Sequence, residues 1–355
     1  MLGRMAKIRD VWADLNPDSN SQPHVSDARG RRLRDLRISV TDRCNFRCVY
    51  CMPRSVFGEE HAFLPKKDVL TFEELARLAS AFVQLGAEKI RLTGGEPLLR
   101  RDLPALIRLL RAIPGLRDLA LTTNGSLLDH LAGPLRAAGL ERLTVSLDSL
   151  NEETFAAMSD ADFPLRRVLA GIEAAVRAGF APIKINMVVK RGLNDHEVVA
   201  MARRFARPPF ILRFIEYMDV GNTNGWRLTD LVPTAEIIAR LQEELPLRPL
   251  SANYRGEVAQ RFRFQEGEIG FISSVTEPFC GDCTRARLSA DGRLFTCLFT
   301  GHGHDLRGLL RSGASEAELQ SAIGKIWRAR DDRYSELRFR QTSPAEKAEM
   351  SLLGG

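Results

Sequence analysis

The stretch TDRCNFRCVYCMPR, residues 41–54, carries the cysteines Cys44, Cys48 and Cys51 in a C-x3-C-x2-C spacing. Three thiolates are one short of the four ligands of a structural zinc site, and no fourth cysteine or histidine follows within the usual spacing. An iron–sulfur cubane fits better, because three cysteines can bind three of its irons and leave the fourth iron open to another ligand. The first question for the rest of the chain is therefore what binds there.

Composition limits the answer. The chain has 355 residues, 44% of them hydrophobic, which predicts a folded protein with one large core or two domains. No window holds the roughly 18 unbroken apolar residues of a membrane span, and the first twenty residues lack a signal-peptide core. We therefore expect a cytoplasmic protein that does not contact a membrane. In that reducing compartment, six clustered cysteines indicate metal binding or redox chemistry, not disulfides.

The net charge of +6 suits an anionic partner, either nucleic acid or a phosphorylated small molecule. A basic surface with no specific partner explains the charge alone equally well. No aromatic-rich stacking surface accompanies the charge, so we do not expect nucleic acid as a partner.

Strand-like runs alternate with amphipathic stretches and predict the fold class. The six runs are LRISVT (36–41), KIRLT (89–93), LALTT (119–123), RLTVSLD (142–148), PIKINMVV (182–189) and FILRFIEYM (210–218). Each leaves room for a crossover helix before the next, which predicts parallel strands with helices outside. One helix is marked by a capping box from Thr71 to Glu74 and a stop at Gly86. We predict an α/β fold, a partial (βα)6 TIM-like barrel.

The pattern changes after the sixth run and predicts three regions. Residues 1–32 are polar and aperiodic and should form a loose, disordered arm. Residues 33–225 should form the barrel, and residues 226–355 a smaller α+β domain that carries the second group of cysteines. In that domain we expect a helix at 233–243, a hairpin from YRGEVAQRFRF and EIGFISSV, and a turn at Asp291-Gly292.

Polar or glycine-rich groups follow strand after strand. After the first cysteine loop come TGGEP (93–97), TTNG (122–125), SLD (146–148) and MDVGN (218–222). The carboxyl ends of the strands form the rim of a βα barrel on which active sites are built. We therefore expect the active site at this rim.

The second cysteine group, Cys280, Cys283 and Cys297, again has three thiols and no fourth. A zinc site completed by His302 or His304 is one interpretation. A second cluster, with an open iron that binds a substrate nitrogen or oxygen, is the other.

Four arginines stand near these cysteine groups. Arg285 and Arg287 follow Cys283 at alternate positions, so on extended backbone both side chains point the same way. Arg37 precedes the first cysteine loop, and Arg91 precedes TGGEP. A guanidinium group can bind two phosphate oxygens at once. Any one of these arginines could instead form a surface ion pair. Together they favour a phosphorylated substrate.

Two motifs together carry a family resemblance. C-x3-C-x2-C with Tyr50 before the third cysteine, and TGGEP after the next strand, resemble the radical S-adenosylmethionine enzymes. The late C-x2-C-x13-C followed by R-x-R narrows the resemblance to the GTP 3′,8-cyclase family, lyases of molybdenum cofactor biosynthesis. The similarity runs from about residue 33 to the end, where Gly354 and Gly355 match a tail that the family uses near its active site. It implies S-adenosylmethionine and two 4Fe-4S clusters as cofactors.

The resemblance also implies a role for each matching residue. The two clusters would be bound by Cys44, Cys48 and Cys51, and by Cys280, Cys283 and Cys297. The S-adenosylmethionine pocket would be lined by Tyr50, Gly95, Ser146 and Met218. GTP would contact Arg37, Arg91, Thr122, Lys184, Arg285 and Arg287, the last two also as catalytic residues. Asn186, on the same strand face as Lys184, is an additional candidate.

The implied reaction converts GTP to 3′,8-cyclo-7,8-dihydroguanosine 5′-triphosphate, the first step of molybdopterin biosynthesis. A 5′-deoxyadenosyl radical removes hydrogen from C3′, and the ribose radical attacks C8 of guanine. The implied partners are the pterin-forming synthase of the next step and an electron donor such as flavodoxin or ferredoxin, and a homodimer is compatible with the resemblance. Two alternatives stay open: another auxiliary-cluster radical S-adenosylmethionine enzyme acting on peptide or RNA, and a non-catalytic iron–sulfur carrier.

Overall fold

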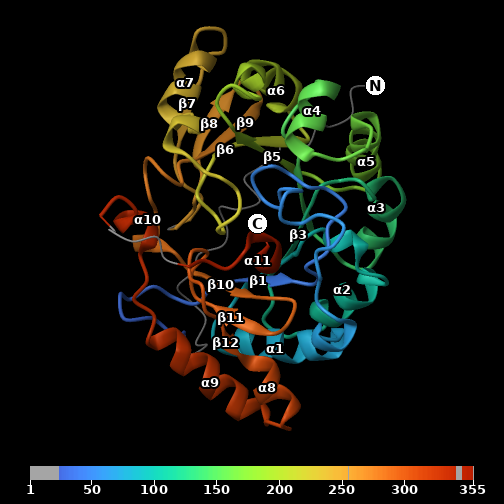
Figure 1. Cartoon of the computed structure of the whole chain (residues 1–355), viewed down its shortest axis with the longest axis vertical. Helices are drawn as coiled ribbons and strands as arrows, with labels where there is room; N and C mark the ends of the chain where they lie inside the picture. The colour runs from blue at the N-terminus through green and yellow to red at the C-terminus, as the bar shows by residue number, and fades with distance from the viewer. Residues whose placement is uncertain (1–23, 255, 341–345, 355) are drawn as a thin grey trace, which may run out of the picture.

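The computed structural model describes residues 24–254, 256–340 and 346–354. Most of the predicted N-terminal arm and the terminal Gly355 lie outside this part of the chain. The described strands form one sheet of twelve in the order β12-β11-β10-β1-β2-β3-β4-β5-β6-β9-β8-β7 (Figure 1). Within the described ranges, no helix is both long and apolar enough to span a bilayer.

The six predicted strands form the centre of this sheet, and each pairs in parallel with the next. They are β1 (Asp35–Ser39), β2 (Lys89–Thr93), β3 (Asp118–Thr123), β4 (Arg142–Ser146), β5 (Ile183–Val189) and β6 (Phe210–Glu216). The alternation along β1 shows how they are oriented. Leu36 and Ile38 are buried in the apolar core, whereas Arg37 between them faces the interior chamber of the barrel. The prediction of a partial βα barrel is confirmed.

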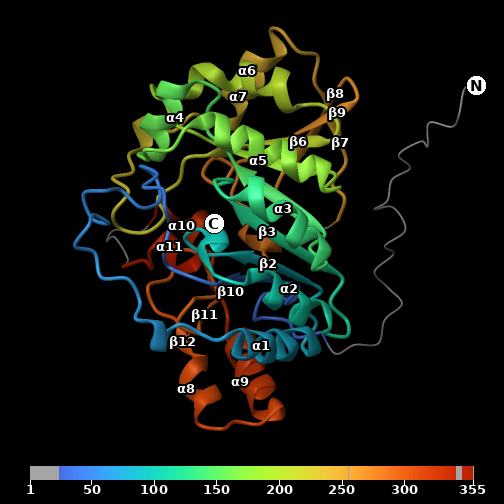
Figure 2. The same cartoon turned by 90° about the vertical axis from the view of Figure 1, so that its right-hand side faces the viewer.

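Helices cover the outer face of these strands (Figure 2). The principal ones are α1 (Phe72–Gln84), α2 (Leu103–Arg111), α3 (Leu128–Ala137), α4 (Glu152–Ser159), α5 (Leu165–Arg177) and α6 (Val198–Phe205). The capping box predicted for α1 is present: Thr71 accepts from the Glu74 amide, and the Glu74 carboxylate accepts from the Thr71 amide. Gly86 follows the helix at φ +107°, a conformation that favours glycine.

Single 3-10 turns connect several elements. They are η1 (Lys66–Asp68), η2 (Pro97–Leu99), η3 (Asp195–Glu197), η4 (Leu228–Asp230) and η5 (Cys280–Asp282). The last of these, η5, contains the first cysteine of the second group.

The last third of the chain extends the sheet at both edges. Its elements are α7 (Thr234–Gln242), β7 (Arg248–Leu250), β8 (Gln260–Phe264), β9 (Gly267–Ile272), β10 (Arg285–Leu288), β11 (Arg293–Phe295), β12 (His304–Asp305), α8 (Leu306–Arg311), α9 (Glu316–Arg328), α10 (Tyr334–Leu337) and α11 (Met350–Leu353). On one side, β9 pairs in parallel with β6 and closes the predicted hairpin with β8. On the other side, β10 pairs in parallel with β1. The sheet thus runs without a break across residue 225, and the division into domains there stays a prediction.

Residues 24–32 differ from the loose arm that their composition predicted. Ser26 bridges Arg32, and the side chains of Asp27 and Arg31 are buried against each other. Composition alone could not show this, because it records two charged residues and not that each neutralises the other.

Candidate functional site

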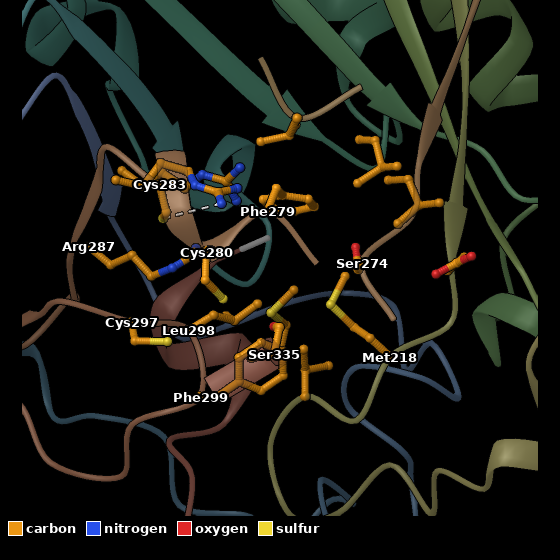
Figure 3. A pocket seen from close by; sticks show the side chains of 18 of the residues that line it. Met218, Ser274, Phe279, Cys280, Cys283, Arg287, Cys297, Leu298, Phe299 and Ser335 are labelled. Carbon is orange, nitrogen blue, oxygen red and sulfur yellow. Dashed lines mark hydrogen bonds between the residues drawn. The ribbon is translucent and has the colours of Figure 1, made fainter. Parts of the chain in front are cut away.

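A deep chamber lies inside the barrel, between the strands and the C-terminal segments (Figure 3). The barrel contributes Arg37, Arg91, Thr122, Ser146, Asp148, Asn186, Arg213 and Met218 to its lining. The C-terminal third contributes Cys280, Cys283, Arg285, Arg287, Cys297 and Met350. In Figure 3, Met218 reaches into the chamber from the side opposite the three cysteines.

The first cysteine loop, which follows β1, has a donor set that fits an iron–sulfur cluster. Its three cysteines are free thiols and are partly buried. Burial raises the pKa of Cys48 far above its usual value, and the Asp148 carboxylate and the neighbouring Cys44 and Cys51 thiols raise it further. Thiols this close and this poorly solvated are stabilised by bound metal, which takes the thiolate form. Tyr50 of the same loop lines the chamber, whereas the three cysteines themselves do not.

The TGGEP segment packs directly on that loop. The Gly95 amide donates to the Thr41 carbonyl at 2.8 Å, and the Glu96 amide to the Arg43 carbonyl at 2.8 Å. A Cβ at Gly95 would overlap the Arg43 carbonyl, so only glycine permits this close approach. Gly95 therefore lies beside the cysteine loop and outside the lining of the chamber, and its place in the S-adenosylmethionine pocket stays a prediction.

Tyr50 is oriented by a buried carboxylate that the sequence analysis did not single out. Its hydroxyl donates to Asp148 Oδ2 at 2.7 Å, and Asp148 Oδ1 accepts from the Val188 amide at 2.8 Å. Burial raises the pKa of Asp148 to about 6, against the opposing effect of these two hydrogen bonds. Asp148 stands in the SLD segment that marked the rim, so its sequence position was a usable signal.

The second cysteine group lines the chamber with all three thiols. Burial acts to raise the pKa of Cys283, but the adjacent Arg285 and Arg330 outweigh burial and lower it to about 6. A thiolate stabilised at neutral pH suits metal binding. In the described ranges, no group of three or more Cys, His, Asp or Glu side chains is close enough to hold a single metal ion. His302 and His304, the histidines of the zinc alternative, are both exposed.

The predicted arginines gather on adjacent strands because of the strand register. Arg37 of β1 is level with Arg91 of β2 on one side and with Arg287 of β10 on the other. Arg91 Nη1 also donates to Thr122 Oγ1 at 2.9 Å and to Thr144 Oγ1 at 3.0 Å. Residues far apart in the sequence thus form one basic wall.

Six cations around the chamber have no carboxylate partner in the described part of the chain, and one of them, Arg287, is buried while the others are partly buried. None of the six cations Arg37, Arg91, Lys184, Arg213, Arg285 and Arg287 forms an ion pair with another described residue. Burial lowers the pKa of Arg91 and of Arg287 to about 10. Burial, together with Arg287, Arg285 and Arg91, lowers the pKa of Arg37 further still. Such a surplus of positive charge favours a bound anion.

Lys184 lies next to the main chamber and not in its lining. It lines a smaller cavity that shares Arg37, Arg91, Arg213 and Arg285 with the chamber. Asn186, two residues further along β5, does line the main chamber, as does Arg213, which pairs in register with it. Arg213 was not among the residues predicted from the sequence, although the alternation in FILRFIEYM places its side chain on the face of β6 that points into the chamber.

The C-terminal segment reaches the same wall. Arg287 Nη1 donates to the Gly354 carbonyl at 2.9 Å, and Met350 lines the chamber. Gly354 has φ +70°, and a Cβ there would overlap the Thr93 side chain. In Figure 1, α11 lies at the centre of the molecule, beside β1. The segment therefore connects the arginine wall with the start of the TGGEP segment.

Comparison with known proteins identifies the family. The profile of the Radical SAM superfamily matches residues 38–205, and that of Molybdenum Cofactor Synthesis C matches residues 210–336. The GTP 3′,8-cyclase of Acidothermus cellulolyticus is 56% identical over 94% of this chain and 100% of the relative. Those of Xanthomonas campestris and Staphylococcus epidermidis are 50% and 44% identical over 96% and 93% of this chain and 99% of each relative. This chain belongs to the GTP 3′,8-cyclase family of radical S-adenosylmethionine enzymes.

Proposed function

We propose that the chain converts GTP to 3′,8-cyclo-7,8-dihydroguanosine 5′-triphosphate, the first step of molybdopterin biosynthesis. The observation that carries this proposal is the wall of largely half-buried cations, without carboxylate partners among the described residues, beside the Cys280, Cys283 and Cys297 group. A triphosphate supplies the negative charge that such a wall lacks, and arginine forks bind phosphate oxygens in pairs. The family membership supports the same substrate.

The predicted residue roles are part of the proposal. Cys44, Cys48 and Cys51 would hold the cluster that binds S-adenosylmethionine, with Tyr50, Ser146 and Met218 around that cofactor. When bound, these groups supply a carbon radical that removes hydrogen from C3′ of GTP. Cys280, Cys283 and Cys297 would hold the second cluster, which would supply a Lewis-acidic iron to the guanine base.

The chain itself contributes orientation and exclusion of water. C3′ and C8 belong to one molecule. Fixing its triphosphate and its base restricts it to few conformations, and in most of these the two carbons face each other. Apolar side chains such as Val188, Ile215 and Leu298 line the chamber and exclude water from the radical. After the C3′–C8 bond forms, one electron and one proton complete the product. We assign Arg285 and Arg287 to stabilising the substrate during this step, because both border the chamber at the second cysteine group.

Further partners belong to the same proposal. An electron donor such as flavodoxin or ferredoxin would reduce the first cluster, and the pterin-forming synthase of the next step would receive the product. The six free thiols support a reducing, cytoplasmic setting. Assembly as a homodimer is open to measurement by light scattering.

Anaerobic reconstitution tests the proposal. The purified chain is loaded with iron and sulfide and incubated with a reductant and S-adenosylmethionine, with and without GTP. We expect about eight irons per chain, 5′-deoxyadenosine, and a cyclised nucleotide by mass spectrometry. An iron–sulfur carrier would give no cleavage. An enzyme acting on peptide or RNA would cleave S-adenosylmethionine and leave GTP intact. Either result would overturn the proposal.

A further inference from the structure

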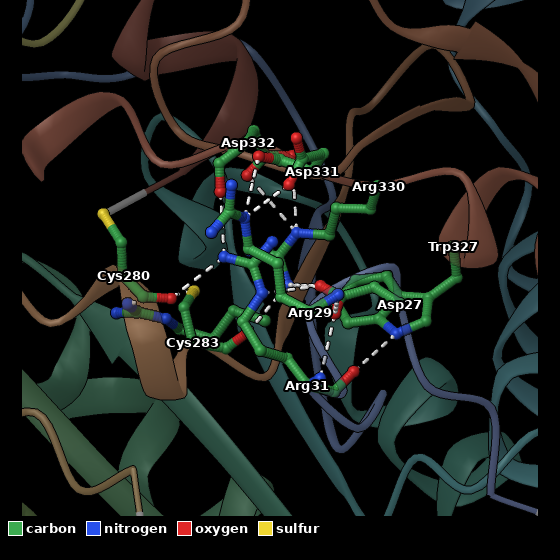
Figure 4. A network of polar contacts seen from close by, with 10 residues as sticks. Asp27, Arg29, Arg31, Cys280, Cys283, Trp327, Arg330, Asp331 and Asp332 are labelled. Carbon is green, nitrogen blue, oxygen red and sulfur yellow. Dashed lines mark hydrogen bonds and ion pairs between the residues drawn. The ribbon is translucent and has the colours of Figure 1, made fainter. Parts of the chain in front are cut away.

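Two buried arginines hold the backbone of the second cysteine loop (Figure 4). Arg31 Nη1 donates to the Cys280 carbonyl at 2.9 Å. Arg330 Nη1 donates to the Cys283 carbonyl at 2.7 Å. Both cysteines of the C-x2-C segment are therefore fixed by charged donors from elements far away in the sequence, and hydrogen bonds of this kind are stronger than those between neutral groups.

The two arginines are held in turn by shared partners. Arg31 Nε lies 2.6 Å from Asp27 Oδ2, and Arg330 Nη1 lies 3.5 Å from the same oxygen. The guanidinium of Arg330 stacks on the Trp327 ring at 4.5 Å, and Trp327 Nε1 donates to the Arg31 carbonyl at 3.1 Å. The side chains of Arg31 and Arg330 are 2% and 1% exposed. The network is thus rigid and almost dry.

One donor of this network lacks a hydrogen-bond acceptor in the part of the chain that the structure describes. Arg31 Nη2 is buried and, among the described residues, has no hydrogen-bond partner. Leaving a buried charged donor unpaired is unfavourable. Arg31 also lines the chamber together with Cys280, Cys283 and Cys297. Nη2 itself is closed off from the chamber, so Arg31 acts on the site through its Nη1 hydrogen bond to the Cys280 carbonyl and through its charge.

We propose that Arg31 and Arg330 are positioning residues for the second cluster, acting through the Cys280 and Cys283 carbonyls and through their buried positive charge. The inference rests on the proposed function, because it requires a cluster at Cys280, Cys283 and Cys297. Nearby positive charge favours the reduced cluster, so the two arginines should raise its reduction potential. Residues 24–33 then belong to the site and are not a loose arm.

The test measures the second cluster apart from the first. In the full chain carrying Cys44→Ala, Cys48→Ala and Cys51→Ala, only the second site can be loaded. A redox titration followed by electron paramagnetic resonance then gives its midpoint potential. We expect Arg31→Gln and Arg330→Gln to shift the potential to more negative values. Arg31→Lys, which keeps the charge and loses the planar fork, should shift it less.

Arg29→Gln is the matched control. Arg29 lies in the same turn, but its side chain is 32% exposed and pairs with Asp331, whereas the side chains of Arg31 and Arg330 donate to the cysteine carbonyls. In the Arg29→Gln variant, the second cluster should have the same midpoint potential and iron content as in the parent. If Arg31→Gln fails to fold, the pair Asp27→Asn and Arg31→Gln removes both buried charges and keeps an acceptor for the turn amides that Asp27 Oδ1 now binds.

Each outcome bears on a separate claim. A parent chain that binds no second cluster defeats the proposed function itself. A loaded parent whose potential is unchanged in both glutamine variants overturns only the present inference. Loss of iron from the second site in Arg31→Gln, with normal loading in Arg29→Gln, supports the positioning role directly.

Discussion

The two cysteine sites have the same number of thiols, but one thiol of the second site, Cys283, has arginines beside it, while Cys297 of the same site has a pKa raised to about 12 by burial and Asp332. At the first site, burial and the Glu96 carboxylate raise the pKa of Cys44 to about 12. At the second, Arg285 and Arg330 overcome burial and lower the pKa of Cys283 to about 6. Negative surroundings oppose the addition of an electron, whereas positive surroundings favour it. From this comparison we expect the first cluster to be the harder of the two to reduce, and the side of the second site near Cys283 to favour an anion.

Removing one thiol from each site gives the largest expected difference. Cys48→Ala should reduce cleavage of S-adenosylmethionine to background, because the first cluster loses a ligand. Cys283→Ala should keep that cleavage and lose the cyclised nucleotide. Chromatography of 5′-deoxyadenosine and mass spectrometry of the nucleotide measure the two products. Cyclised nucleotide from either variant would show that the division of labour is wrong.

The arginine wall should affect only the second half of the reaction. Arg285→Ala or Arg287→Ala should weaken GTP binding about 10- to 100-fold, since each charge-assisted contact contributes roughly 1.5–3 kcal/mol. Cleavage of S-adenosylmethionine should persist while the cyclised product is lost. Arg293→Ala on the adjacent β11 is the control, because its side chain is 48% exposed and pairs with Asp291. Full product yield from both wall variants would exclude the assigned role.

Gly354→Ala tests the segment that connects the two regions. The added methyl group would overlap Thr93, so the segment should leave its position on Arg287. We expect roughly tenfold less cyclised product with both clusters loaded, and faster digestion of the C-terminus by carboxypeptidase. Gly313→Ala has a comparable positive φ of +90° with no atom near its added carbon, and it should retain activity. Equal loss in both variants would point to general strain instead.

Asp148→Asn gives the smallest effect and examines the first site without cofactors. Burial raises the pKa of Asp148 from 3.8 to about 6, so the folded state holds this proton more tightly than the unfolded state. Its contribution to stability is therefore complete below pH 4 and is lost as pH rises through about 6. The variant should gain roughly 1–3 kcal/mol of unfolding free energy over the parent between pH 4 and 7 in urea titrations. The exposed Asp162→Asn should show no such trend, and a flat difference for Asp148→Asn would contradict the argument.

The parts that sequence predicted well depend on neighbouring residues. The six strands, the cap of α1 at Thr71 and the C-x3-C-x2-C loop are all local patterns, and the structure contains each of them. Period-two alternation also placed Lys184 on the inward face of β5. The alternation could not show how far along the barrel a side chain lies, because that depends on how neighbouring strands are staggered. In the structure, Lys184 lies beside the main chamber and Asn186 lines it.

The parts that sequence missed depend on distant pairing. Nothing near Arg31 in the sequence indicates that its side chain meets the Cys280 carbonyl. The register that sets Arg37 beside Arg287 likewise joins segments 250 residues apart. The pattern identified Arg285 and Arg287. It did not show that β10, the strand that carries them, belongs to the same sheet as the barrel strands.

That pairing of β10 with β1 has a consequence for how the enzyme is assembled. Strand β1 is made early, and until β10 emerges its outer edge has no partner, a state that invites association between chains. The arginine wall is completed by the same event that covers this edge. A chain truncated before residue 280 should therefore be an aggregation-prone species and not a half-active enzyme, and protection of the β1 edge and competence to bind nucleotide should arise in one cooperative step.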